Sequence, residues 1–382
     1  MRFRLTNLRF LLWCTVRFLM HGRATARVAQ PSRIAVVQTG KLGDMVCTTP
    51  VFRAIKKSYP KARVVAVGDR VNKALLDCNP DVDEYLVYQK NPWQIIKALS
   101  AMHIDVGVSI GPSPDTVAML YLAGAHLVVA PRITNGFTPL ETRAGRLIKK
   151  FVAVAPLSIG AYAPREYLKL LEPLGIESDD TKKHLGFSSE AGRHVRDFFV
   201  AHGLEPGRDL FVGIVPGTGY AIKLWPRERF AALAEHLSES YQAKIVLLGA
   251  PSDRVYLAEL ADHLDKLHVP YTDTGGLFTM DEFKAAVARL SLVIGVDTGT
   301  IYVAEAFGVS TVDIVGPMDE REQPPVGRLN KVVVAQRRAP QVHIMNVTYS
   351  DEREARRQSE DISVEMVRRA VDELMAEIAT QS

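Results

Sequence analysis

Short runs of apolar residues alternate along most of the chain with longer segments of helical periodicity. In the first half, the apolar runs are residues 34–37, 63–67 and 106–110, and a helical pattern occupies residues 45–58. Buried parallel strands have such continuous apolar sequences, and the helices that connect them carry one apolar face. The pattern therefore predicts a parallel sheet with helices on both of its faces.

The same pattern starts again after a less regular stretch near residues 157–210. Strands are expected at residues 211–215, 244–248, 292–296 and 311–315, and helices near residues 227–240, 254–264 and 280–290. Thr279 and Glu282 form a capping box at the start of the last of these helices. Two such series predict an α/β protein with two Rossmann-like domains whose parallel sheets face a central cleft.

The predicted organisation has four parts, and the boundary between the two domains is expected near residues 180–205. The parts are an N-terminal arm (residues 1–30), a first Rossmann-like domain (31–190), a second Rossmann-like domain (191–355) and a C-terminal helix (356–382). The helix is predicted from an apolar stripe that runs from Val364 to Ile378. Because such a stripe must be covered, the helix is expected to pack back on the body of the protein.

The positive charge of the chain is concentrated at its N-terminus. The 382 residues include 47 Lys and Arg against 43 Asp and Glu, but residues 1–33 contain seven arginines and no acid. The rest therefore has 40 basic and 43 acidic residues, which argues against a nucleic-acid partner. The three cysteines, Cys14, Cys47 and Cys78, are too scattered for a disulfide framework or a structural zinc site.

The arm contains an apolar and aromatic segment, residues 8–20, that Arg9 and Arg17 interrupt. The segment is too short and too charged to span a bilayer. It suits a helix at an anionic membrane surface, with the arginines at headgroup level. In that interpretation the residues expected to insert are Phe10, Leu11, Trp13 and Phe18. A secretory signal peptide, a frayed tail and a misassigned start codon are the alternatives.

The first strand leads into a glycine-containing loop that carries a candidate base. Thr39, Gly40, Lys41 and Gly43 precede Asp44, which stands at or just before the start of a helix. The glycines allow the backbone to approach a ligand closely. Asp44 is a candidate general base, although an aspartate in this place often only caps its helix.

Three loops of the second half combine glycine, hydroxyl and charged residues at strand ends. Pro216–Pro226 contains Thr218 and Lys223, and Asp253 follows the next strand. After the strand that ends at residue 296 come Asp297, Thr298, Gly299, Thr300 and, further on, Tyr302. Backbone amides at a helix N-terminus, hydroxyls and a lysine suit a phosphate group, and a carboxylate at a strand end suits ribose hydroxyls. Asp297 is anionic, so it is expected to orient the loop or cap the helix. Together the three loops predict a nucleoside-diphosphate site.

Three long segments resemble the signatures of glycosyltransferase family 9, the bacterial heptosyltransferases. They are TGKLGDMVCTTPVFRAIKKSYPKARV (residues 39–64), VGIVPGTGYAIKLWPRERFAALAEHL (residues 212–237) and VIGVDTGTIYVAEAFGVSTVDIVGP (residues 293–317). The resemblance covers roughly residues 32–320, with a fourth match near 362–378. Two departures are Tyr302, where the family usually has His, and the absence of cysteines from residues 336–350.

The resemblance implies a GT-B fold and an inverting, metal-independent transfer with no cofactor. The donor would be an ADP-heptose-type sugar, and the acceptor a lipopolysaccharide inner-core sugar. Asp44 falls on the family's catalytic base, Lys223, Thr298 and Gly299 on contacts of the donor diphosphate, and Asp253 on a nucleoside contact. Tyr302 can donate a hydrogen bond to phosphate but carries no positive charge.

Residues 131–150 form a basic segment in the acceptor-side domain. Arg132, Arg143 and Arg146 contribute to a net charge of +4 there, which suits a phosphorylated glycolipid or the anionic membrane that holds it. A solvated surface is the alternative. The resulting hypothesis is a cytoplasmic transferase bound peripherally to the inner face of the bacterial inner membrane. A different nucleotide sugar, an epimerase of the same fold and a nucleotide-sugar-binding protein without transfer activity are the competing interpretations.

Overall fold

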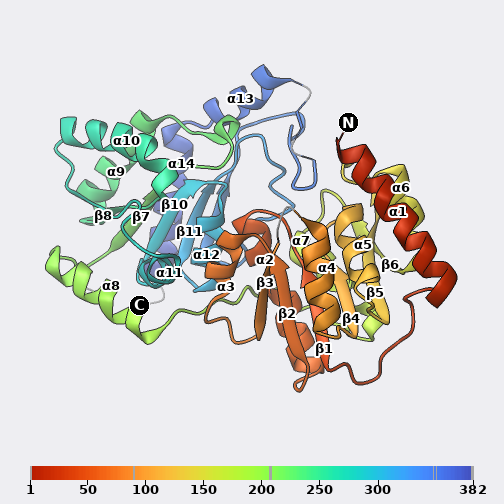
Figure 1. The fold of residues 1–382 in the computed structure, drawn as a ribbon. Helices are drawn as coiled ribbons and strands as arrows, with labels where there is room; N and C mark the ends of the chain where they lie inside the picture. Colours follow the sequence, from red (N-terminus) through yellow and green to blue (C-terminus); the bar gives the residue numbers. More distant parts are fainter. Residues whose placement is uncertain (1, 89–90, 206–208, 347, 350, 380–382) are drawn as a thin grey trace. The chain divides into compact units, whose positions relative to one another are not determined.

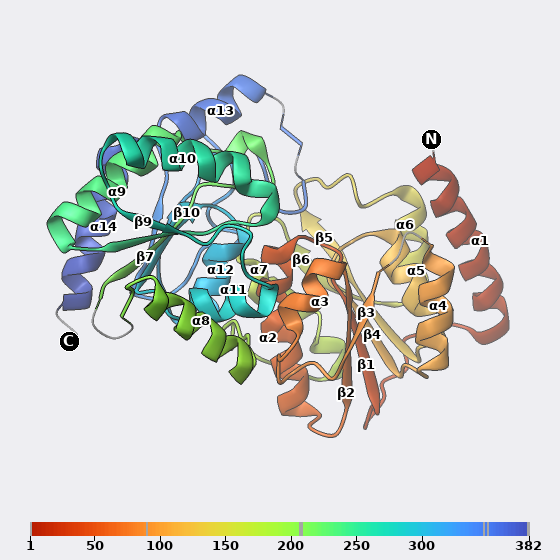
Figure 2. The ribbon, with the colours of Figure 1, turned by 60° about the vertical axis from the view of Figure 1, so that its left-hand side comes forward.

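The computed structural model describes residues 2–88, 91–205, 209–346, 348–349 and 351–379. The chain divides into two compact units, unit 1 (Met1–His184) and unit 2 (Leu185–Ser382). Each unit contains one six-stranded sheet in which all strand pairs are parallel, with helices packed on it (Figures 1 and 2). The predicted α/β class with two Rossmann-like domains is confirmed.

Unit 1 has an N-terminal helix followed by alternating strands and helices. Its elements are α1 (Arg2–His21), β1 (Arg33–Val37), α2 (Leu42–Ser58), β2 (Arg63–Gly68), α3 (Arg70–Leu76), β3 (Glu84–Val87), α4 (Pro92–Ala101), β4 (Val106–Ser109), α5 (Pro114–Leu122), β5 (Leu127–Asn135), α6 (Arg143–Ile148), η1 (Lys149–Phe151), β6 (Ala153–Ser158), α7 (Ala163–Lys169) and η2 (Glu172–Leu174). The strand order is β3-β2-β1-β4-β5-β6, which is the Rossmann order, with the switch point between β1 and β4.

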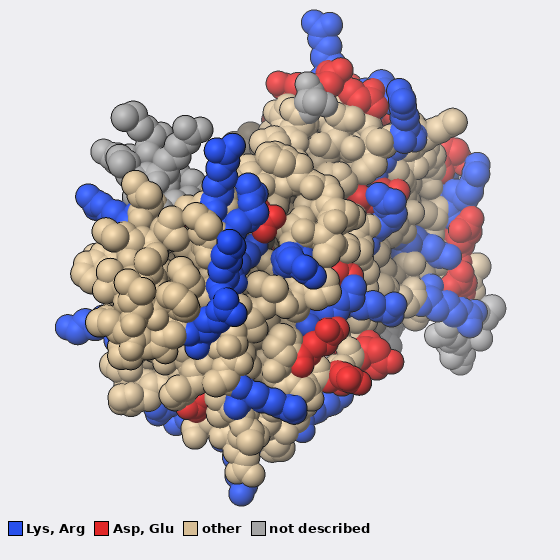
Figure 3. Space-filling model, turned by 90° about the vertical axis from the view of Figure 1, so that its right-hand side faces the viewer, with Lys and Arg blue, Asp and Glu red and all other residues tan. Residues whose placement is uncertain are grey.

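The N-terminal arm is a structural part of unit 1, because α1 packs on α5 and α6. Phe10 and Cys14 are buried in the same apolar cluster as the centre of α5, and Phe18 stacks on Phe151. The expectation that Phe10 inserts into a membrane is therefore wrong, because its side chain fills the core. Trp13, in contrast, is 52% exposed. Figure 3 shows the α1 side of the molecule, where Lys and Arg side chains form a band across mostly uncharged surface.

Unit 2 repeats the arrangement and ends in two helices. Its elements are α8 (Ser189–Ala201), β7 (Phe211–Val215), η3 (Ala221–Lys223), α9 (Arg227–Tyr241), β8 (Lys244–Leu247), η4 (Pro251–Asp253), α10 (Arg254–Lys266), β9 (Tyr271–Asp273), α11 (Met280–Val287), β10 (Leu292–Val296), α12 (Gly299–Ala306), β11 (Ser310–Ile314), β12 (Asn330–Val333), α13 (Glu352–Glu360) and α14 (Val364–Ala379). The strand order β12-β11-β10-β7-β8-β9 has the topology of unit 1, with the switch point between β10 and β7.

The core of unit 2 lies between its sheet and the helices α9, α10 and α14. Trp225 is fully buried there, and its indole Nε1 donates a hydrogen bond to the carbonyl of Ile362, 2.7 Å away. Val367, Val371 and Leu374 of α14 are fully buried in the same cluster. The final helix thus covers the sheet of its own unit. Among the described residues, no helix combines the length and the apolar character that crossing a membrane requires.

Candidate functional site

Three loops of unit 2 leave the carboxyl ends of β7, β8 and β10, which are adjacent strands. In β7 and β10 the register pairs Val215 with Gly295, so the two strands end side by side. Loops on either side of a switch point diverge to opposite faces of the sheet and leave a crevice in which ligands bind. The topology therefore brings together the three segments that the sequence singles out.

Lys223, Asp297 and Tyr302 form a buried network at this edge of the sheet. The Lys223 ammonium donates hydrogen bonds to the backbone carbonyl of Asp297 and to its Oδ2, the latter at 2.9 Å. The Tyr302 hydroxyl donates to Oδ1 of the same carboxylate. Asp297 thus joins the lysine that follows β7 to the tyrosine of α12. The lysine is fixed in place by a buried ion pair.

A second buried carboxylate, Asp313 of β11, lies next to this network. Burial raises the pKa of Asp313 well above its usual value, and the like charge of Asp297 adds to the effect, while Lys223 partly opposes it. This buried environment therefore favours the protonated form of the Asp313 carboxyl. A cavity of about 10 Å³, which suits a single water molecule, is lined by Asp297, Tyr302 and Asp313 among others.

The loop after β7 approaches Asp253 closely. A Cβ atom on Gly217 would lie 2.7 Å from Cγ of Asp253, so a larger residue at this position would displace the Asp253 side chain. Asp253 also accepts a hydrogen bond from the backbone N–H of Ala250 at 2.9 Å, which is the capping role considered for it. The buried hydroxyl of Thr218 has no hydrogen-bond partner within the described part of the chain. Buried hydroxyls are normally satisfied, so a ligand or an ordered water is expected to bond to Thr218.

Helix α12 begins beside the network and offers its first amides. Its N-cap residue is Thr298, whose side chain does not cap the helix. Thr298, Gly299 and Thr300 are all partly exposed, whereas Asp297 is buried. Free N–H groups and the positive end of the helix dipole favour a negatively charged group at such a position.

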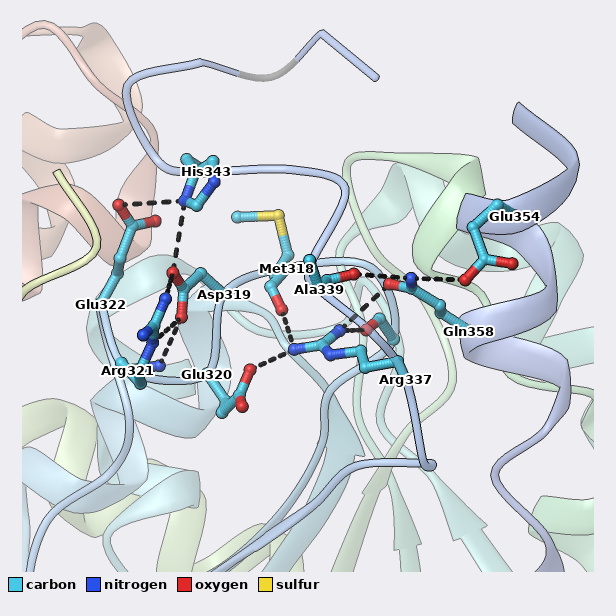
Figure 4. Close-up of polar contacts among 11 residues, drawn as sticks. Met318, Asp319, Glu320, Arg321, Glu322, Arg337, Ala339, His343, Glu354 and Gln358 are labelled. Atoms are coloured by element: carbon cyan, nitrogen blue, oxygen red, sulfur yellow. Dashed lines mark hydrogen bonds and ion pairs between the residues drawn. The ribbon is translucent and has the colours of Figure 1, made fainter. Parts of the chain in front are cut away.

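The segment that follows β11 is held by charged side chains (Figure 4). Arg337 donates hydrogen bonds to the carbonyl of Met318 at 2.6 Å and to the carboxylate of Glu320. Asp319 accepts from Arg321 at 2.7 Å, and His343 lies 3.4 Å from it. Hydrogen bonds from Arg321 hold the pKa of Asp319 below its usual value although burial opposes this. Met318, Asp319 and Glu320 also line the small cavity beside Tyr302, so this cluster fixes one wall of the network.

In unit 1, Asp44 lies in the first turn of α2 and not before it. Its Oδ2 accepts a hydrogen bond from the backbone N–H of Lys41 at 2.8 Å, completing a cap of the helix. A Cβ atom on Gly40 would lie 2.5 Å from that oxygen, which explains the glycine. The carboxylate is only partly exposed, and the loop backbone fixes its position.

Side chains from neighbouring elements support this loop. Gln38 accepts a hydrogen bond from the N–H of Gly40 at 2.9 Å, and Asn72 donates to the Gly40 carbonyl at 3.1 Å. Thr39 is exposed and Gly43 is buried. The loop is thus a rigid holder for Asp44 at the carboxyl end of β1, which is the edge of the sheet where ligands bind in such folds.

The three arginines predicted on the acceptor side separate into two groups. Arg132 is exposed on β5, whereas Arg143 and Arg146 are exposed on α6. Glu141 pairs with the buried Lys149 at 2.6 Å, so the acid of this segment is already neutralised. Over the residues that the structure describes, no group of three or more His, Cys, Asp or Glu side chains is arranged to hold a metal ion.

Comparison with known proteins identifies the family. The family described as "Glycosyltransferase family 9 (heptosyltransferase)" matches residues 160–349, which include Lys223, Asp297 and Tyr302. The chain belongs to glycosyltransferase family 9. It is a glycosyltransferase, as its motifs predict. The matched range begins after Asp44, so the role of that residue rests on its loop and on the resemblance of the first motif.

Known relatives of this family 9 enzyme span most of its length. Lipopolysaccharide heptosyltransferase 3 of Escherichia coli K12 is 23% identical over 288 residues, which cover 72% of this chain and 80% of the relative. A family 9 glycosyltransferase from Veillonella parvula superposes with a TM-score of 0.75 and 22% identity over 91% of this chain and 98% of that chain. The solved structure of Escherichia coli heptosyltransferase WaaC with ADP superposes with a TM-score of 0.66. The two chains are 15% identical, and the superposition covers 90% of this chain and 99% of that chain. These likenesses support the GT-B fold.

Two parts of this family 9 enzyme's site were not predicted from its sequence. One is Asp313, whose signal is an acidic residue within an otherwise apolar strand. The other is Arg337, which binds Glu320 although the two residues are 17 positions apart. No local sequence pattern predicts that ion pair. The predicted residues Thr218, Lys223, Asp253 and Asp297 lie in loops that the topology brings together, and Tyr302 joins them from α12.

Proposed function

We propose that the enzyme transfers a heptose-type sugar from an ADP-linked donor to an inner-core sugar of lipopolysaccharide or of a related glycolipid. The observation that carries this proposal is the Lys223–Asp297–Tyr302 network at the switch point of unit 2. A nucleoside diphosphate needs a fixed positive charge and amide donors, and this edge of the sheet offers both. Membership of the heptosyltransferase family and a relative named lipopolysaccharide heptosyltransferase 3 support the sugar and the acceptor.

The donor diphosphate would bind to Lys223, to the hydroxyls of Thr218 and Thr298, and to the first amides of α12. Asp253, at the end of the neighbouring strand, would accept hydrogen bonds from the ribose. When the sugar leaves, negative charge develops on the diphosphate, and a preorganised cation and amides stabilise that charge. A solved structure of heptosyltransferase WaaC with ADP has the same fold, which supports adenine as the base.

Asp44 would act as the general base of an inverting, metal-independent transfer. The acceptor hydroxyl is a weak nucleophile until a carboxylate removes its proton, and the proton then resides on Asp44. The acceptor oxygen attacks the anomeric carbon as the bond to the diphosphate breaks. The fixed loop around Asp44 supports this role, because a base must be held within hydrogen-bond reach of the hydroxyl.

The acceptor is proposed to be a phosphorylated glycolipid in the cytoplasmic leaflet of the bacterial inner membrane. Arg132, exposed on β5, would contribute to its recognition, and the exposed Arg143 and Arg146 would contact phosphate groups of the membrane that holds it. Guanidinium groups bind phosphate through paired hydrogen bonds. The enzyme would then act in the cytoplasm, at the membrane that carries its acceptor.

A panel of nucleotide sugars tests the donor. ADP-, UDP-, GDP- and CDP-sugars are added separately, and the thermal unfolding midpoint is measured. A ligand at 100 times its Kd stabilises the folded state by about 2.7 kcal/mol. Stabilisation by ADP-sugars alone supports the proposal, whereas stabilisation by UDP-sugars alone assigns a different donor. Mass spectrometry of a core-oligosaccharide acceptor after incubation then separates transfer from binding without transfer.

A further inference from the structure

Helix α1 is apolar on the side that faces away from unit 1 as well as on the side that faces it. Phe10 and Cys14 form its buried side. The outward-facing apolar residues, with their exposed fractions, are Leu8 (62%), Leu12 (63%), Trp13 (52%), Val16 (37%), Leu19 (78%) and Met20 (66%). A surface helix of a globular protein normally carries polar residues on its outer side. We call this set of six residues the α1 face.

The α1 face is fixed in place and is not a frayed end. The rings of Phe10 and Trp13 both pack against Trp93 of α4, with centroid distances of 5.9 Å. The Tyr121 hydroxyl donates a hydrogen bond to the carbonyl of Gly22, 2.5 Å away, just after the helix. Ala24 then forms a bridge with Val152 beside β6. A contiguous apolar surface held rigidly in water is typical of an interaction site.

The charge around the α1 face is predominantly positive, although α5, which also packs against α1, carries the partly buried Asp115. Helices α1, α4 and α6 together contain no Asp or Glu, and α6 packs against α1. Exposed basic residues in this region are Arg9, which lies among the residues of the α1 face, and Arg143 and Arg146 on α6. Figure 3 shows this side, where the basic band crosses an area with few acidic side chains.

We propose that the α1 face is the surface by which the enzyme docks on an anionic lipid bilayer. The six apolar side chains enter the interface between headgroups and acyl chains, and Arg9, Arg143 and Arg146 contact lipid phosphates. This assigns Arg143 and Arg146 to the membrane rather than to the acceptor sugar. A second copy of the chain is a poorer occupant, because a two-fold interface would bring the same basic residues against each other.

This inference extends the proposed use of a membrane-held acceptor, but its test needs neither donor nor transfer. The full-length protein is mixed with vesicles of phosphatidylcholine, with or without phosphatidylglycerol, and the fraction that floats with the vesicles is measured. We expect binding to the anionic vesicles only, weakened by salt because the headgroup contacts are screened.

Two pairs of substitutions separate the apolar and the basic contributions. Leu12→Gln with Leu19→Gln removes apolar surface without touching the buried side of α1, and Arg143→Gln with Arg146→Gln removes the charge of α6. Each pair is expected to lower the vesicle partition coefficient about tenfold or more. The matched controls are Val200→Gln with Leu267→Gln, which are exposed apolar positions, and Arg193→Gln with Arg196→Gln, which have the same spacing on α8. The controls are expected to bind as the parent does.

The inference is overturned if the parent protein does not bind anionic vesicles, or if the α1 variants bind as tightly as the parent. The α1 face is assigned to a second copy of the chain instead if the parent protein forms a dimer and does not bind vesicles, and if Leu12→Gln with Leu19→Gln makes the protein monomeric. Nucleotide-induced thermal shifts are measured on the same samples. If vesicle binding is lost but nucleotides still raise the thermal midpoint as in the parent, the donor proposal stands. If vesicle binding is retained but nucleotides no longer raise the thermal midpoint, only the donor proposal is affected.

Discussion

The Tyr302 hydroxyl donates a hydrogen bond to the Asp297 carboxylate, whose other oxygen accepts from Lys223. The tyrosine therefore acts on the proposed phosphate-binding lysine through an intermediate carboxylate. Histidine, the usual residue of the family at this position, can be positively charged, whereas tyrosine cannot. In the proposed donor site, Lys223 supplies positive charge that Tyr302 cannot, so the orientation of the lysine by Asp297 matters for binding.

Replacement of Tyr302 by Phe is expected to weaken donor binding about tenfold, because Asp297 loses the hydroxyl that holds it. A hydrogen bond to a charged group contributes about 1.5–3 kcal/mol. We expect a higher KM for the donor with a smaller change in kcat, measured by initial rates over a range of donor concentrations. Tyr302→His should retain more donor affinity than Tyr302→Phe.

Tyr241→Phe is the matched control for the tyrosine substitution. The Tyr241 hydroxyl donates a hydrogen bond to the Asp372 carboxylate at 2.8 Å, so this substitution also removes one hydroxyl–carboxylate bond from unit 2. The bond joins α9 to α14 and does not involve the loops of the network. Tyr241→Phe should change thermal stability but not the KM for the donor. Equal KM values for Tyr302→Phe and the parent would remove Tyr302 from the donor site.

Lys223→Ala is expected to affect both stability and donor binding. The substitution leaves the buried Asp297 carboxylate without its cation, a change that typically costs about 3–5 kcal/mol. Thermal denaturation measures this loss, and titration with ADP measures affinity. The double variant Lys223→Met with Asp297→Asn should recover stability without recovering ADP binding. If the double variant binds ADP as the parent does, the lysine does not contact the diphosphate.

The strands predicted from the sequence are the inner strands of each sheet, and most of those missed are edge strands. Six of these inner strands are buried along nearly their whole length and have mostly apolar sequences: β1, β2, β4, β7, β8 and β10. β11 is equally buried, although it contains Ser310, Thr311 and Asp313. β3, β6, β9 and β12 lie at or next to solvent and are mostly half-buried, so their sequences mix polar and apolar residues. Among the strands of the described residues, β5 is the inner strand that was missed, because its second half is mostly polar and largely exposed.

The site was predictable as a set of loops but not as a set of contacts. Glycine and threonine next to the ends of apolar runs identify Thr218, Asp253 and Thr298 from local sequence alone. The pairing of Lys223 with Asp297 joins residues 74 positions apart, and it depends on the placement of β7 next to β10. That order is a property of the folded sheet. For the same reason Phe10, in a segment that resembles a membrane helix, gave no local signal of its burial.

The buried Asp313 gives the stability of unit 2 a specific pH dependence. Its pKa is raised by burial and by Asp297, so between about pH 4 and its folded-state pKa the folded state holds a proton that the unfolded state releases. Stability is therefore lost as the pH rises through this range, by up to about 1.4 kcal/mol per pH unit. Asp313→Asn removes this dependence. The variant's stability relative to the parent should increase from pH 4 to pH 8 in urea denaturation.

Asp372→Asn is the control, because the pKa of Asp372 is lowered and its effect on stability changes with pH in the opposite direction. Burial tends to raise the pKa of Asp372, but hydrogen bonds from His236 and Tyr241 hold it below its usual value. Its contribution to stability is thus present above the unfolded-state pKa and lost as the pH falls, so Asp372→Asn should cost more at pH 7 than at pH 3. A constant difference between Asp313→Asn and the parent at all pH values would mean that Asp313 is ionised in the folded protein.

Asp44→Asn is expected to lower the rate of sugar transfer by roughly 100-fold or more, the usual effect of removing a general base. The amide oxygen of asparagine can still accept the hydrogen bond from the Lys41 N–H, so the loop and the start of α2 should keep their structure. ADP affinity and the thermal midpoint should therefore stay close to those of the parent. Glu190→Gln, which neutralises an exposed acid in the first turn of α8, is the matched control and should transfer at the parental rate. If Asp44→Asn retains parental transfer, the carboxylate only caps its helix and another group accepts the proton.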